Sequence, residues 1–143
     1  MAITVNFKTN KGIITNRTFE KNEGVSIYGK LTGLFGVGEP GTWIRLNILN
    51  ENNQSILTKE TNANLWGDYD FYFVTPNQDT KLKIVLVATY SIAGYDETTI
   101  PIAIGNKTPE SLPQPQAETS LLSFIPIIIL AGLGLFIYKE IKK

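Results

Sequence analysis

The sequence contains neither cysteine nor histidine. Without cysteine the chain can form no disulfide framework and no thiolate metal site. Without histidine it lacks the commonest general base, the commonest zinc ligand and any ordinary catalytic triad. We therefore expect no catalytic, cofactor-binding or metal-ligating residue, and we predict that the protein is not an enzyme.

An excess of charge of one sign is also missing. The 143 residues carry 13 basic and 13 acidic side chains, so the net charge is zero. Residues 1–119 hold ten basic and twelve acidic groups, and residues 139–143 hold three lysines against one glutamate. The sequence shows no basic patch of the kind that binds nucleic acid. We expect neither nucleic acid nor a small-molecule substrate as a partner.

One long stretch has no charge at all. Residues 121–138, "LLSFIPIIILAGLGLFIY", contain two polar side chains, both near the ends. As a helix these 18 residues would measure about 27 Å, close to the ~30 Å core of a bilayer. The pattern predicts a single transmembrane helix, with a buried helix of a soluble core as the alternative. The residues expected to contact lipid are Leu121, Phe124, Ile128, Leu130, Phe136 and Tyr138.

The flanks of this stretch indicate its orientation. The basic tail, residues 139–143, favours the cytoplasmic side, which would leave residues 1–119 on the other side of the membrane. The N-terminal "MAITVNFKTNKG" lacks the apolar run of a signal peptide. Export of residues 1–119 across a membrane would normally require a signal peptide, so the two patterns conflict for a cell-surface protein. They are compatible for a viral protein that is made in the cytoplasm, inserts its C-terminal helix and is then enclosed with the membrane.

Residues 1–105 alternate apolar and polar side chains, as half-buried strands do. In "TWIRLNILN", Ile44, Leu46 and Ile48 share one face, and the polar residues between them share the other. "SILTKETN" is more polar, as expected of an edge strand, and Pro101 places the last strand at an edge too. Turn signals between the segments favour an all-β sandwich of about seven strands. The predicted strands are residues 2–9, 24–31, 42–50, 55–62, 68–75, 80–90 and 98–104.

Two motifs stand in the second half of this region. "TNANLWGDYDFYF" contains the pattern Thr-x-Ala…Gly-x-Tyr-x-Phe, and a pair of tyrosines follows in the next two strands. The positions are Thr61, Ala63, Gly67, Tyr69, Phe71, Tyr90 and Tyr95. With these motifs, residues 24–105 resemble immunoglobulin-like modules of prokaryotic and viral surface proteins. The resemblance implies an immunoglobulin-like β-sandwich over residues 1–105, although the Cys…Trp…Cys pattern of antibody domains is absent.

Residues 106–120, "NKTPESLPQPQAETS", separate the predicted sandwich from the predicted anchor. They contain three prolines and one large apolar residue. Such a composition is typical of an extended linker, which at ~3.1 Å per residue could reach about 45 Å. The sequence therefore predicts a stalk that holds the sandwich away from the bilayer.

The apolar segment "LTGLFGVGEPGTW", residues 31–43, is the candidate binding site. No Gly-Lys-Ser/Thr follows its four glycines, so it is not a phosphate-binding loop. In one interpretation its apolar side chains fold back and cap the end of the sandwich. In the other they form a contact surface for a partner protein. The candidate contact residues are Leu34, Phe35, Val37 and Trp43.

The acidic residues of the turns are candidate ligands for calcium and candidate groups for acid–base chemistry. Their spacing matches no EF-hand, and Asp68 and Asp70 alternate with core residues on an exposed strand face. We interpret these carboxylates as solvated turn residues.

Together these patterns predict a non-enzymatic, membrane-anchored structural or interaction protein. The favoured setting is a virion in which the chain links a capsid or spike layer to a lipid membrane. The expected partners are the membrane and other structural proteins of the assembly. The alternatives are an adhesion or assembly protein of the cell surface, and an accessory subunit of a membrane enzyme complex.

Overall fold

The computed structural model describes residues 2–33, 41–90 and 94–112 of the chain. These residues form ten β-strands, with no helix among them. The strands are β1 (Ala2–Ile3), β2 (Asn6–Thr9), β3 (Gly12–Ile14), β4 (Thr18–Phe19), β5 (Gly24–Thr32), β6 (Trp43–Leu49), β7 (Ser55–Asn62), β8 (Asp68–Val74), β9 (Thr80–Tyr90) and β10 (Gly94–Ile104).

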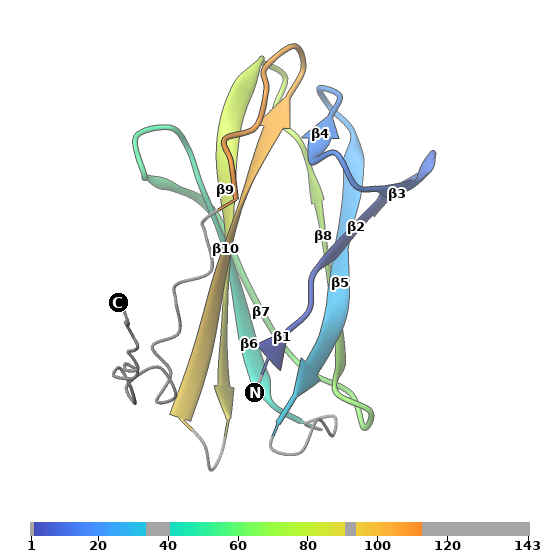
Figure 1. The fold of residues 1–143 in the computed structure, drawn as a ribbon, viewed down its shortest axis with the longest axis vertical. Helices are drawn as coiled ribbons and strands as arrows, with labels where there is room; N and C mark the ends of the chain where they lie inside the picture. Colours follow the sequence, from blue (N-terminus) through green and yellow to red (C-terminus); the bar gives the residue numbers. More distant parts are fainter. Residues whose placement is uncertain (1, 34–40, 91–93, 113–143) are drawn as a thin grey trace, which may run out of the picture. The chain divides into compact units, whose positions relative to one another are not determined.

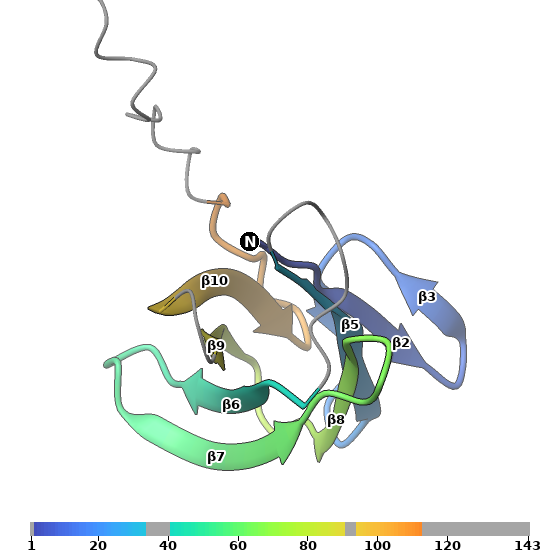
Figure 2. The same cartoon turned by 90° about the horizontal axis from the view of Figure 1, so that it is seen from below.

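The strands form two sheets that pack face to face, so the described part of the chain is a β-sandwich (Figures 1 and 2). In the first sheet β1 and β2 pair with one edge of β5, β8 pairs with the other edge, and β3 pairs with β2. The second sheet has the order β4-β10-β9-β6-β7. All neighbours are antiparallel except β4 and β10, where Ala103 pairs with Thr18 and Ile104 with Phe19 in parallel.

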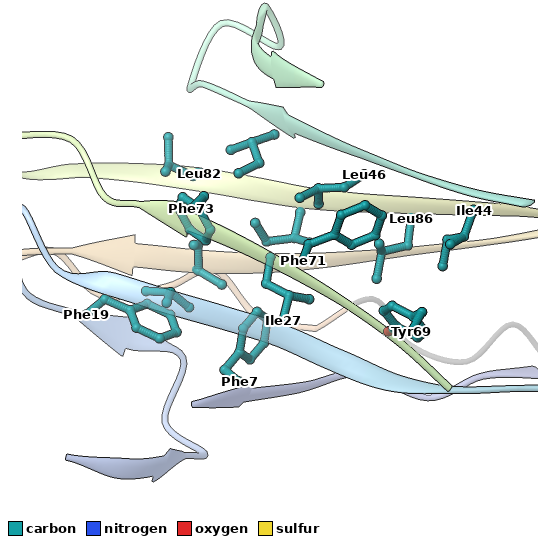
Figure 3. Packing of buried hydrophobic residues seen from close by; sticks show 14 of the residues in the cluster. Phe7, Phe19, Ile27, Ile44, Leu46, Tyr69, Phe71, Phe73, Leu82 and Leu86 are labelled. Atoms are coloured by element: carbon teal, nitrogen blue, oxygen red, sulfur yellow. The ribbon is translucent and has the colours of Figure 1, made fainter. Parts of the chain in front are cut away.

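The core lies between the two sheets and follows the predicted alternation. Leu46 and Leu86 from one sheet and Ile27 and Phe71 from the other point into the same layer (Figure 3). Inward positions were predicted for every strand except 55–62, and all of them are buried or pack against this core, which confirms that interpretation. Each large aliphatic side chain that leaves water here contributes about 1.5–3 kcal/mol to the hydrophobic driving force.

The predicted first strand is divided into β1 and β2, because the chain departs from regular pairing at Thr4. The Thr4 N–H donates to the Lys30 carbonyl at 3.0 Å, and the Lys30 N–H donates to the Thr4 hydroxyl at 2.8 Å. The Thr4 carbonyl lies so close to Gly29 that a Cβ there would be 1.9 Å from its oxygen. The Tyr69 hydroxyl donates to the same carbonyl at 2.6 Å. Because residue 29 is a glycine, the Thr4 carbonyl can lie against β5 and accept a hydrogen bond from Tyr69 of β8. This bond links the first strand to β8.

Two other predictions of strand position need correction. β3 and β4 were not predicted, because segments of two or three residues carry no readable alternation. β7 is the last strand of its sheet, as predicted, but β10 lies between β9 and β4 rather than at an edge. Pro101 is tolerated because pairing with β4 involves only Ala103 and Ile104, and the Arg17 side chain donates to the Pro101 carbonyl at 2.7 Å.

The compact unit that contains the sandwich runs from Met1 to Leu112, and therefore includes the first part of the predicted stalk. The Arg17 guanidinium also donates to the Glu110 carbonyl at 2.9 Å. The rest of the predicted stalk, the predicted helix 121–138 and the tail 139–143 lie outside the described residues. In the part of the chain that is described, no helix has the length and apolar character needed to cross a bilayer.

Candidate functional site

The predicted contact segment connects β5 to β6. Leu34, Phe35 and Val37 lie outside the described residues. Trp43 begins β6 on the outer face of its sheet, where it is half-buried. The Arg45 guanidinium lies over the Trp43 ring, 5.0 Å from its centroid, and the Arg45 Nε is 3.5 Å from a Glu60 carboxylate oxygen. Arg45 therefore covers part of the indole.

Gly41 and Thr42, which lead into β6, are hydrogen-bonded to the chain at the end of β7. The Gly41 N–H donates to the Ala63 carbonyl at 3.0 Å, and the Ala63 N–H donates to the Thr42 carbonyl at 2.8 Å. The Asn62 side chain donates to the Gly41 carbonyl at 3.0 Å. Gly41 has a φ of 73°, in the left-handed region that glycine adopts at least cost. These bonds place Trp43 beside the turn between β7 and β8.

That turn presents two large apolar side chains to solvent. The Asn64 side-chain oxygen accepts from the Trp66 and Asp68 N–H groups at 2.9 Å each, and the Gly67 N–H donates to the Asn64 carbonyl at 3.0 Å. This closed turn leaves Leu65 78% and Trp66 68% exposed. Sequence reasoning missed both residues. The sequence pattern that could have indicated them is "NLWG", in which Asn64 and Gly67 stand on either side of Leu65 and Trp66. Asn and Gly favour a tight turn, and the residues between them then face solvent.

Tyr95 adds a third exposed apolar group at the same end, with 65% of its surface exposed. Tyr95 and Trp43 both pair with Thr89 of β9, from opposite sides. The β7–β8 turn, the last residues of β5 and β9 and the first residues of β6 and β10 lie at one end of the sandwich (Figure 1). We call the surface formed by Trp43, Leu65, Trp66 and Tyr95 the loop end.

The charges around the loop end are mostly paired with neighbours. The Lys30 ammonium lies 3.2 Å from an Asp68 carboxylate oxygen and donates to the Trp66 carbonyl at 2.9 Å. Asp68 and Asp70 are exposed on β8, as predicted. Within the described ranges, no group of three or more acidic side chains converges as a metal site would require. The Asp79 carboxylate accepts from the Asn106 N–H at 3.2 Å, which is a turn-stabilising role.

A polar hollow of about 570 Å³ lies at the other end of the sandwich, beside the β2–β3 and β4–β5 turns. Lys8, Lys11 and Lys21 line it, together with Glu20 and Glu23. The Lys11 ammonium is hydrogen-bonded to Glu20, which raises the pKa of Lys11, and it lies 3.8 Å from Glu23. The Lys21 ammonium lies 3.8 Å from an Asp79 carboxylate oxygen, so two of the three lysines are paired with carboxylates and the hollow offers little surplus charge to an anion.

Comparisons with known proteins give information about the fold alone. No family model matches the sequence, and no curated protein matches it. Among solved structures, the chain is similar to the soluble domain of PmoD from Methylocystis sp. ATCC 49242 (Rockwell), with a TM-score of 0.50 and 8% identity over 72% of this chain and 90% of that one. It also matches the C-terminal domain of Wzt at a TM-score of 0.43 and 9% identity, over 78% of this chain and 81% of that one.

Proposed function

We propose that this chain is a non-enzymatic binding protein, an immunoglobulin-like sandwich that contacts a protein partner through the loop end and is held at a lipid membrane by residues 121–138. The observation that carries the binding role is the exposure of Leu65, Trp66 and Tyr95 at one end of the sandwich. Single exposed apolar residues are ordinary, but aromatic residues gathered on one surface are typical of contact sites.

The order of the strands supports the immunoglobulin-like part of this assignment. Immunoglobulin-like sandwiches place the last two strands beside the third major strand in one sheet and pair the second with the fifth in the other. Here β10, β9 and β6 are neighbours in one sheet, and β5 pairs with β8 in the other.

The position of the loop end supports a tethered binding role. β10 ends at Ile104, at the opposite end of the sandwich from the β7–β8 turn of the loop end (Figure 1). A partner can therefore approach the loop end without meeting the end of the last strand. The virion setting expected from the sequence belongs to this assignment, and its partner would be another structural protein.

The contact is tested by site-specific photocrosslinking in the membranes that contain the full chain. A benzophenone amino acid replaces Trp66 in one variant and Ile13, which is 66% exposed on β3, in a matched control. We expect one protein to be crosslinked from position 66, to be lost when Leu65→Ser is added, and to be absent from position 13. Equal crosslinking from both positions would rule out the loop end as the contact site.

The membrane role needs a separate test, because it depends on residues outside the described ranges. The full chain should stay in the pellet after alkaline carbonate extraction of membranes. The double variant Ile128→Glu, Leu130→Glu should be released, since a charge at the centre of a spanning helix costs ~3 kcal/mol. A wild-type chain found in the carbonate supernatant would exclude the anchor and leave the loop-end contact open to its own test.

A further inference from the structure

A second surface, separate from the loop end, lies along the side of the sandwich where β7 and β8 face each other. β7 is the last strand of its sheet, and β8 pairs with β5 alone among the strands of the described ranges. Figure 2 shows β7 and β8 next to each other at this side. Each strand therefore has one edge that no described strand covers.

The hydrogen-bonding groups on the uncovered edge of β8 can be assigned from the ladder. The Leu31 N–H donates to the Gly67 carbonyl at 2.8 Å, and the Thr75 N–H donates to the Glu23 carbonyl at 2.9 Å. Odd-numbered residues thus direct their backbone groups toward β5. Because the direction alternates along a strand, Asp70, Tyr72 and Val74 direct their N–H and C=O groups toward the uncovered edge. The Tyr72 carbonyl accepts from the Lys59 ammonium at 2.5 Å.

One half of this side is apolar. A hollow of about 400 Å³ lies between β7 and β8, lined on the β8 side by Tyr72, Phe73 and Val74. On the β7 side it is lined by Ile56 and Leu57, with Lys59 as the one charged side chain in the lining. Ile56 is 48% exposed and Val74 56% exposed. An apolar side chain entering this hollow would remove these surfaces from water.

The other half is polar and acidic. A hollow of about 380 Å³ is lined by Asn62, Asn64, Asp68 and Asp70, among others. Lys30 neutralises Asp68, whereas the exposed Asp70 carboxylate makes no ion pair within the described residues. This half of the edge has an unbalanced negative charge.

We propose that the uncovered edge of β8 binds an extended segment of a partner protein as an added antiparallel strand. Its apolar side chains enter the hollow on the inward side, beside Ile56 and Phe73, and a basic side chain lies beside Asp70. The edge supplies backbone hydrogen bonds and the two hollows supply specificity, which is how strand addition works elsewhere. β8 of a second copy brings Asp68 and Asp70 and no basic residue, so it does not satisfy Asp70.

Lys59 guards this edge, in the sense that its ammonium occupies the Tyr72 carbonyl and so hinders the addition of a strand. Its pairing with Leu46 places its side chain on the inward face of β7, where its ammonium holds the Tyr72 carbonyl. An inward-pointing charge on an edge strand is a known device against uncontrolled strand pairing. A bound strand must displace this ammonium from the Tyr72 carbonyl, so binding requires a strand that compensates for the lost bond.

The test uses the full chain, labelled with ¹⁵N in detergent micelles, and the peptide Thr-Val-Thr-Val-Arg-Thr-Arg. In antiparallel pairing its two valines oppose Phe73 and Phe71, and its first arginine opposes Asp70. We expect saturable shifts of the Asp70, Tyr72 and Val74 amide signals and at least tenfold slower exchange of these amides. The same peptide with glutamate in place of arginine should bind at least tenfold more weakly.

Two variants make this test specific. Val74→Pro removes an N–H that points to the uncovered edge and leaves the pairing with β5 intact, whereas Val74→Ala keeps that N–H. The proline variant should bind the peptide roughly fivefold more weakly than the alanine variant, with both keeping the wild-type pattern of core signals. Trp66→Ser should leave peptide binding unchanged, which separates this surface from the loop end.

Four outcomes would overturn the assignment. They are equal binding of the arginine and glutamate peptides, shifts confined to residues away from β8, formation of dimers through β8 without peptide, and slow exchange of the three amides before any peptide is added.

Discussion

The two sides of the sandwich are closed in different ways. On one side β4 runs beside β10, the Ala103 N–H donates to the Arg17 carbonyl at 3.0 Å, and the Gly105 N–H donates to the Phe19 carbonyl at 2.8 Å. The Phe19 ring packs edge-on against Phe7, with centroids 5.5 Å apart. On the other side, the bond from Lys59 to the Tyr72 carbonyl joins β7 to β8 midway along β8.

The difference shows what it takes to cover a strand edge. The first side is covered by backbone, because β4 brings its own N–H and C=O groups to β10. The second is covered by a flexible side chain, which can satisfy one carbonyl and can also leave. The first side is therefore built for stability, and the second keeps its backbone groups accessible to another strand.

The largest expected effect is on the closed side. Phe19→Ala removes a buried ring that holds β4 against Phe7, so we expect a loss of about 3–5 kcal/mol in unfolding free energy. Ile56→Ala, on the open side, should cost about 0.5 kcal/mol, as most exposed substitutions do. Urea unfolding of both variants measures the contrast. Similar losses at the two positions would mean that the two sides are equally buried.

Arg17→Met should have the next largest effect. The change removes two charged hydrogen bonds, to the Pro101 and Glu110 carbonyls, with a cost of roughly 1.5–3 kcal/mol. It should also release the segment around Glu110, so that trypsin cuts after Lys107 earlier than in the wild type. Arg45→Met, which removes an exposed pair with Glu60 and the contact with the Trp43 ring, is the control; it should cost less than about 1 kcal/mol and should not change the first cut.

Tyr69→Phe should cost about 1 kcal/mol, because it removes the bond from the Tyr69 hydroxyl to the Thr4 carbonyl. Burial raises the pKa of Tyr69 above its ordinary value of ~10. The unfolded state therefore ionises first, and the stabilisation from Tyr69, complete below pH ~10, is lost as the pH rises further. In stability curves between pH 8 and 11, the phenylalanine variant should show a smaller decline than the wild type.

Lys59→Met should have the smallest effect on stability, within about 0.5 kcal/mol, because the side chain is exposed. Its consequence should appear in binding, since the Tyr72 carbonyl is then free for another strand. The arginine peptide should bind more tightly to this variant than to Lys107→Met, a control at an exposed position. Unchanged or weaker binding would show that Lys59 does not guard the edge.

Much of the sandwich was predictable from the sequence, because burial on one face imposes a period of two on the side chains. That period identified the core positions of the long strands, such as Ile44, Leu46 and Ile48. It could not identify β4, whose two residues form a strand only because β10, far away in the sequence, lies beside them. Pairing between distant segments leaves no local pattern.

The candidate surfaces were less predictable for a related reason. An apolar residue indicates burial on average, so Leu65 and Trp66 did not stand out until the Asn64 turn placed them in solvent. The edge of β8 reads as an ordinary core strand, since Tyr69, Phe71 and Phe73 are all buried. Whether a strand has one neighbour or two is a property of the assembled sheet.

The pairing of β10 with β9 has a mechanical consequence. Eleven residues, from Gly94 to Ile104, pair with β9 along the full length of the strand. A force pulling on Ile104 and opposed by a force at the loop end would act along β10 and across its inter-strand bonds. These bonds would share the tension and rupture together instead of opening one after another, so the domain would resist stretching along β10.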